Sequence, residues 1–129
     1  MFTKTVRTAA LIAAGLSLFG CASSDKEEER LAALASQRAQ VLSAGLPIEH
    51  GPLKVMQAKA DGKVIKLMMI YNDSRAIPVQ KLISSSINYY CSNPDVKQNL
   101  DLGLSYQIKI RNSRGQLLTD QGISADSCQ

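Results

Sequence analysis

Few side chains in this 129-residue sequence are of types that could make or break covalent bonds in a substrate. The single histidine, His50, stands beside Glu49 in a predicted loop, where an isolated imidazole is usually solvated. Three consecutive serines, residues 84–86, fall on a predicted helix surface without a neighbouring base to activate them. Beyond residue 30 the carboxylates occur singly, and the sequence has no HExxH, CxxC, P-loop or GxSxG motif. We therefore expect no catalysis, metal site, cofactor or small-molecule substrate.

The three cysteines remain, and the first of them follows an export signal. Lys4 and Arg7 form a short basic start, and an apolar run of 11 residues extends from Ala9 to Phe19. About 20 residues are needed to span a bilayer, so this run is too short for a transmembrane helix. Residues 1–20 are therefore predicted to be a signal peptide.

The end of that signal resembles a bacterial lipobox. It reads Leu18-Phe19-Gly20-Cys21, and in such proteins the cysteine thiol is diacylated before the preceding bond is cut. An ordinary signal peptide with a chance cysteine is the alternative, but the small residue before Cys21 and the Ser-rich, charged segment after it favour lipidation. Ala22, where an Asp would retain a lipoprotein in the inner membrane, implies the periplasmic face of the outer membrane. Residues 21–29 are expected to form a lipidated tether.

Export also bears on the other two cysteines. Cys91 and Cys128 would lie in an oxidising compartment, and with Cys21 lipidated they are the pair that remains. A disulfide between them would stabilise the domain by roughly 4 kcal/mol through closure of a long loop. Two free thiols or a metal-binding pair are the alternatives. The sequence has few further His or Cys residues that could complete a metal site. We predict a structural disulfide.

The exported chain has the size and charge of one small binding domain. Removal of the signal leaves 109 residues, of which residues 30–129 are expected to form the domain. The formal charge falls from +4 to +2, because Lys4 and Arg7 leave with the signal. So small a charge makes no basic stripe, and nucleic acid is not an expected partner.

Apolar periodicity predicts seven elements in the order α-β-β-α-α-β-β. The expected helices cover residues 25–44, 78–91 and 96–102, and the expected strands cover residues 53–60, 64–71, 106–111 and 116–123. The strand Val64–Tyr71 is apolar at almost every position, which is typical of a central strand. We expect an α+β fold, with a small antiparallel sheet of four to five strands flanked by helices and one disulfide.

The methionines at positions 56, 68 and 69 allow two interpretations. A methionine most often fills a gap in a core. Soft, adaptable side chains also suit an apolar groove that receives a partner helix. The second interpretation is favoured here, because the strand at residues 64–71 is apolar on both faces in a domain with few helices to cover it.

An ordered series of motifs runs through most of the exported chain. It consists of the lipobox Cys21, an Ala/Ser/Gln/Arg helix, Ser43-Ala44-Gly45-Leu46-Pro47-Ile48, Leu67-Met68-Met69-Ile70, Tyr90-Cys91-x-x-Pro94-x-Val96-Lys97, Gly103-Leu104-Ser105-Tyr106-x-Ile108-x-Ile110 and Cys128. From about Ala35 to Cys128 this order and spacing resembles the type II secretion pilotins of the AspS class, which are lipoprotein partners of secretin channels. No single motif is specific, but the series is.

The resemblance implies a fold, a partner and a role. It implies a sheet flanked by helices, a disulfide between the two late cysteines, and a hydrophobic groove that binds the C-terminal helix of a secretin subunit. The lipid would carry that subunit to the outer membrane, where the multimer assembles, so the chain would be a targeting factor and not an enzyme. We expect the groove between the first helix and the sheet, at Leu31, Leu34, Val41, Leu42, Val55, Leu67 and Met69.

A second function fits the same features. An outer-membrane lipoprotein with another structural or inhibitory binding role in the envelope would have the same lipobox, disulfide and α+β fold. Loss of secretin multimers on deletion of the protein would separate the two functions.

Overall fold

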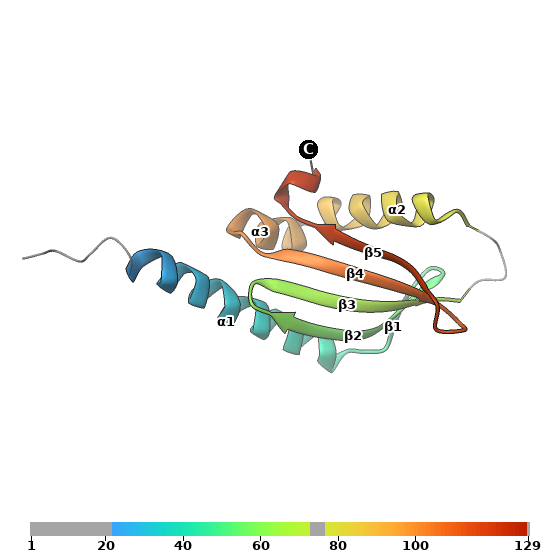
Figure 1. Ribbon diagram of the computed structural model, residues 1–129, viewed down its shortest axis with the longest axis horizontal. Helices are drawn as coiled ribbons and strands as arrows, with labels where there is room; N and C mark the ends of the chain where they lie inside the picture. The colour runs from blue at the N-terminus through green and yellow to red at the C-terminus, as the bar shows by residue number, and fades with distance from the viewer. Residues whose placement is uncertain (1–21, 73–76, 129) are drawn as a thin grey trace, which may run out of the picture.

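The computed structural model describes residues 22–72 and 77–128, which build a five-stranded sheet with helices on one side (Figure 1). In chain order the elements are α1 (Ala22–Ala44), β1 (Ile48–His50), β2 (Leu53–Asp61), β3 (Val64–Tyr71), α2 (Val79–Ser92), α3 (Pro94–Leu102), β4 (Ser105–Asn112), β5 (Leu117–Ile123) and the 3-10 helix η1 (Ala125–Cys128). The strands lie side by side as β1-β2-β3-β4-β5. The predicted signal peptide and Cys21 lie outside the described residues.

β3 is the central strand, as its apolar sequence predicts. On the side of the helices its residues are buried, whereas Lys66 and Met68 on the other side are only half-buried. The buried residues of β3 meet those of β4 in register, in the pairs Ile65–Tyr106, Leu67–Ile108 and Met69–Ile110. The core therefore lies between the sheet and the helices.

The sheet is mixed, and the prediction of a wholly antiparallel sheet is wrong at one pair of strands. β2 and β3 form an antiparallel hairpin through a turn at Asp61-Gly62, where Gly62 has a φ of 57°. β4 and β5 are also antiparallel, but β3 and β4 run parallel. Parallel neighbours need a long crossover between them. The two consecutive helices α2 and α3 supply it, and they bring the chain back to the end of the sheet where β3 begins.

The ends of α3 follow from local sequence chemistry. The Asn93 side chain accepts hydrogen bonds from the backbone N–H groups of Asp95 (3.0 Å) and Val96 (3.3 Å), and Pro94 occupies the first turn. Gly103 ends the helix with a φ of 110°. A Cβ at Gly103 would lie 3.3 Å from a methyl carbon of Leu31, so this glycine also lets α1 approach closely.

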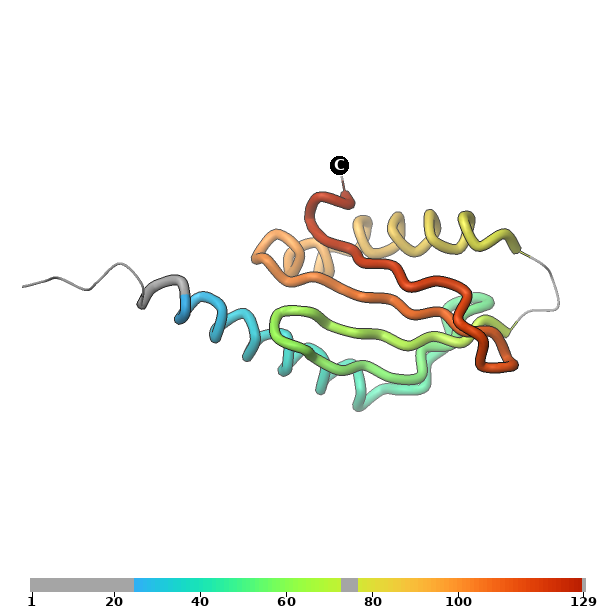
Figure 2. The backbone as a smooth tube through the Cα atoms, viewed as in Figure 1, coloured from blue at the N-terminus to red at the C-terminus, as the bar shows by residue number. Residues whose placement is uncertain are grey.

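α1 begins earlier than predicted and extends beyond the sheet (Figure 2). The segment expected to be a tether is helical from Ala22 onwards, and residues 25–30 are exposed. Lys63 Nζ in the β2–β3 turn lies 3.0 Å from Glu28 Oε1. The helix then packs on β2 and β3 through Leu31, Ala35 and Ala39, which are spaced i, i+4, i+8 and are at most 6% exposed.

Candidate partner-binding groove

The helices do not fill the covered side of the sheet evenly. A cavity of about 700 Å³ remains between the β1–β2 turn and α2. The turn contributes residues 50–53, the sheet contributes Met69, and Ile77 and Pro78 lie at the start of α2. From α2 itself the wall includes Lys81, Leu82, Ser85, Ser86, Tyr89 and Tyr90. The lining is mainly apolar and aromatic, and its polar side chains include two serines and one lysine.

α2 lines this groove with one flank and packs on the sheet with another. Leu82, Ser86 and Tyr90 are spaced i, i+4, i+8 and are buried. Ser85 and Tyr89 each stand one residue before a buried position, and both are exposed and line the groove. Tyr89 leaves 49% of its surface in water, so a large apolar ring is available for contact with a partner.

A row of rings crosses the site from the turn to the sheet. The ring centroids of His50 and Tyr89 lie 5.4 Å apart, those of Tyr89 and Tyr90 5.6 Å, and those of Tyr90 and Tyr106 5.3 Å. Burial raises the pKa of the Tyr90 phenol. Burial also raises the pKa of Tyr106, against the opposing effect of the hydrogen bond that Asn99 Nδ2 donates to its hydroxyl at 3.1 Å. Both phenols stay neutral at ordinary pH, so the inner end of the row carries no charge.

α1 lies on β2 and β3, on the same side of the sheet as α2. Leu34, Arg38 and Val41 lie at i, i+4 and i+7 on the flank next to its buried face, with Val41 63% exposed. After burial and the Asn99 hydrogen bond, the positive charge of Arg38 is the third influence on the pKa of Tyr106, which it lowers.

The space between the first helix and the sheet, where we expected the groove, is filled by packed side chains. Leu31, Val55 and Leu67 are 5–6% exposed, because α1 packs directly on β2 and β3. Leu34 is half-buried against the same core, and Val41 and Leu42 are exposed. Met69 is buried but lines the cavity. The candidate site therefore moves to the other side of the covered face, next to α2.

No residue of α2 is among the predicted groove residues, and His50 was expected to be merely solvated. The pair Tyr89-Tyr90 is a sequence signal for the α2 wall of this cavity. Neighbouring residues on an α-helix point about 100° apart, so only one of two adjacent tyrosines can face the core. The other must lie at a surface or a site.

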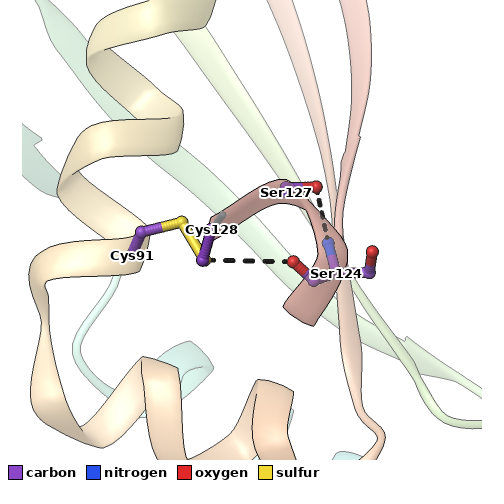
Figure 3. Close-up of a disulfide and its surroundings, with 4 residues drawn as sticks. All are labelled: Cys91, Ser124, Ser127 and Cys128. Atoms are coloured by element: carbon purple, nitrogen blue, oxygen red, sulfur yellow. Dashed lines mark hydrogen bonds between the residues drawn. A yellow bond between two sulfur atoms is a disulfide. The ribbon is translucent and has the colours of Figure 1, made fainter.

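A disulfide holds the last turn of α2 against the C-terminus (Figure 3). Cys91 and Cys128 are bonded with their Cα atoms 5.3 Å apart, which confirms the predicted pairing. Cys128 ends η1, and the backbone N–H of Ser124 donates a hydrogen bond to Ser127 Oγ at 3.1 Å in the turn that leads there. Because Cys91 directly follows Tyr90, the bond holds the part of α2 that carries both tyrosines of the wall.

His50 is exposed and its ring lies beside that of Tyr89. Within residues 22–72 and 77–128, no three His, Cys, Asp or Glu side chains come together as a metal site. In the same part of the chain, no helix has the length and apolar character needed to cross a membrane.

Residues 27–128 match the family model described as the type II secretion system pilotin, S protein. The chain belongs to this pilotin family. The match covers the whole fold from the second turn of α1 to the disulfide, and it agrees with the resemblance found in the sequence motifs.

Relatives of this pilotin share its sequence and its fold. Pilotin AspS 2 of Escherichia coli O78:H11 (strain H10407, ETEC) is 31% identical over 100 residues, which are 75% of this chain and 71% of that protein. The solved structure of the Vibrio vulnificus type 2 secretion pilotin EpsS is 51% identical, with a TM-score of 0.79 over 81% of this chain and 97% of that one. The cryo-EM structure of the ETEC pilotin–secretin complex AspS–GspD matches at 23% identity and a TM-score of 0.51, over 74% of this chain and 88% of that one. This last similarity is one of fold.

Proposed function

We propose that this pilotin binds the C-terminal helix of a type II secretin subunit and targets the subunit to the outer membrane for multimer assembly. The observation that carries the proposal is the apolar groove of about 700 Å³ between the β1–β2 turn and α2. Its wall includes an exposed aromatic ring on a helix that a disulfide holds in place.

The shape and chemistry of the groove favour a helical segment. A helix with its side chains is about 10–12 Å wide, so a cavity of this size receives the side chains of one helix face and not a whole helix. Such a partner would present anchors at i, i+3, i+4 and i+7 to the row of rings. The neutral phenols of Tyr90 and Tyr106 suit apolar anchors. The related AspS in complex with the secretin GspD supports the class of partner.

The lipid anchor would supply the destination. Cys21 directly precedes the first residue of α1, and the lipobox around it supports acylation at that thiol. One acyl chain binds a membrane only reversibly, whereas two or more hold stably. Ala22 after the cysteine supports sorting to the periplasmic face of the outer membrane. A subunit held in the groove would be carried there and kept at high local concentration.

The decisive test is a calorimetric titration of residues 22–129, with the disulfide formed, with the C-terminal peptide of the same organism's secretin. This piece contains the entire described core, and the EpsS structure that it matches spans the same domain. We expect saturable one-to-one binding with a negative heat-capacity change, because apolar surface is buried. Ser85→Trp should weaken binding at least tenfold, because Ser85 lines the groove and the indole would fill it.

Ser84→Trp is the matched control. Ser84 is the neighbouring exposed residue of the same helix and does not line the groove, so its variant should bind like the wild type. If the folded wild-type domain binds no peptide, the proposal is overturned. Equal binding by the Ser85 and Ser84 variants would move the site away from α2.

A further inference from the structure

The face of the sheet that no described helix covers has a basic centre (Figure 1). Lys54 and Lys59 lie on β2, Lys66 lies on β3, and Lys109 and Arg111 lie on β4. Each of the five is next to a buried residue of its own strand. Because successive side chains of a strand point to opposite faces, all five point away from the core. This surface of β2, β3 and β4 is called the open face.

The strand register places these cations on both sides of an apolar strip. Met68 and Ile70 of β3 are half-buried on the open face. Ile70 stands between Lys54 of β2 and Arg111 of β4, and Met68 stands beside Lys109 of β4. Neighbouring strands are about 4.8 Å apart, so the backbones of β2 and β4 are separated by roughly 10 Å across the strip. A helix with its side chains is about 10–12 Å wide, so the strip and its flanks fit one helix.

Negative charge on this side of the sheet lies at its rim. Glu49 belongs to β1 and Asp120 to β5, which are the two edge strands. Asp61 ends β2, and its Oδ2 lies 2.8 Å from Lys66 Nζ. A flat anionic bilayer would meet these carboxylates together with the cations, whereas a single helix along β3 would meet mainly the basic centre. The distribution of charge therefore favours a narrow acidic partner over a membrane surface.

The lysines that flank the strip are available to such a partner. Within residues 22–72 and 77–128, Lys54, Lys59 and Lys109 take part in none of the ion pairs. Asp120 is opposite Lys109 in the strand register, but its Oδ1 accepts a hydrogen bond from Gln107 Nε2 at 2.8 Å. In this part of the chain, cations on both flanks of the strip thus lack a carboxylate partner.

We propose that the open face binds an acidic amphipathic helix of a partner protein, which lies along β3. Its apolar stripe contacts Met68 and Ile70, and its two flanks of carboxylates face the cations of β2 and β4. Methionine adapts its shape to the surface it meets, and charges around an interface raise the association rate and the specificity. The site is separate from the groove, because the groove lies on the covered side of the sheet. The domain can therefore hold this second partner while the groove is occupied.

Two synthetic helical peptides test the proposal against residues 22–129. They share one leucine stripe, and their flanking positions are Glu in the first peptide and Lys in the second. We expect the Glu peptide to bind about tenfold more tightly at about 0.1 M salt, and the preference to shrink as salt rises to about 1 M. The backbone amide NMR shifts on its titration should be largest in β2, β3 and β4. Ser85→Trp should leave this binding unchanged, because Ser85 lines the groove.

Paired substitutions test the cations of the two flanks. Lys59→Gln with Lys109→Gln removes one cation from each flank and should lower the affinity for the Glu peptide about tenfold. Lys81→Gln with Lys97→Gln is the matched control, because these lysines are exposed on α2 and α3 and the change in net charge is the same. The control should bind the Glu peptide like the wild type.

The outcomes that contradict the proposal are distinct from failure of the proposed function. Equal affinity for the two peptides, or equal losses in the two paired variants, would overturn the proposal. If Ser85→Trp blocks the Glu peptide, the peptide binds in the groove and the separate site is wrong. Lysine-dependent binding to vesicles of anionic phospholipid, without binding of the Glu peptide, would identify a membrane surface instead. The secretin peptide reports on the groove, so loss of its binding overturns the proposed function and leaves the open face standing.

Discussion

α1 and α2 cover the same side of one sheet, yet α1 packs tightly on the strands beneath it and α2 leaves a groove at its flank. α1 meets β2 and β3 through Leu31, Ala35 and Ala39, and two of these three side chains are single methyl groups. α2 packs through Leu82, Ser86 and Tyr90, and a cavity of about 700 Å³ lies beside it. Small buried side chains let a helix lie close along the sheet, whereas large and unequal ones leave space at its flank. The presence of a groove therefore follows from the sizes of the buried residues and not from apolar content alone.

The largest effect should come from cutting the disulfide that holds the α2 side. Joint replacement Cys91→Ser and Cys128→Ser should lower the free energy of unfolding by roughly 4 kcal/mol, because the loop that the disulfide closes regains its entropy in the unfolded chain. Urea unfolding of the variant and the wild type measures this loss. Affinity for the secretin peptide should fall as well, because Tyr89 and Tyr90 directly precede Cys91. A loss no greater than the 0.5 kcal/mol or so of an ordinary surface substitution would contradict the prediction.

A smaller effect should follow from enlarging the α1 contact. Ala35 is 0% exposed, so Ala35→Leu should overpack the interface with the sheet and lower stability by about 1–3 kcal/mol. Thermal and urea unfolding measure the change. Ala33→Leu is the matched control, because Ala33 is an exposed residue of the same helix and a leucine there should be nearly neutral. If both variants are equally stable, α1 does not pack as closely as the comparison with α2 requires.

The smallest effect concerns pH and the α2 side alone. The pKa of the buried Tyr90 phenol is raised above its ordinary value of 10.0 by desolvation. The contribution of the neutral phenol to the free energy of unfolding is therefore complete below about pH 10 and is lost as the pH rises further, by up to about 1.4 kcal/mol per pH unit. Tyr90→Phe removes this ionisation, so its unfolding free energy should fall less steeply above pH 10 than that of the wild type. Parallel pH profiles for the two proteins would contradict the prediction.

Local chemistry made much of the fold predictable. The seven expected elements are all present, and the central position of β3 is confirmed. The start of α3 at Asn93-Pro94, its end at Gly103 and the Asp61-Gly62 turn follow from the same local chemistry. Each depends on residues close together in the chain or on the apolar character of a single segment. The disulfide was predictable as well, because lipidation of Cys21, as the lipobox predicts, would leave two cysteines to pair.

The groove was not predictable in the same way. The residues expected to line it were chosen because they are apolar, and apolar residues line cores as well as grooves. Leu31 and Leu67 are core residues because α1 packs directly on the sheet. That close packing depends in turn on the small buried side chains of Ala35 and Ala39. His50 and Tyr89 lie 39 positions apart in the sequence, and the β1–β2 turn brings their rings to 5.4 Å.

By itself the sequence determined seven of the elements, the cysteine pairing and the family motifs, because these depend on local propensity and on residue types in order. The tertiary structure decided the parallel pairing of β3 with β4 and the position of the groove. A connection of two helices can return the chain to either end of a sheet, and packing between residues far apart selects one. Likewise, whether a helix closes on the sheet or leaves a space depends on the volumes that meet there, which no single segment specifies.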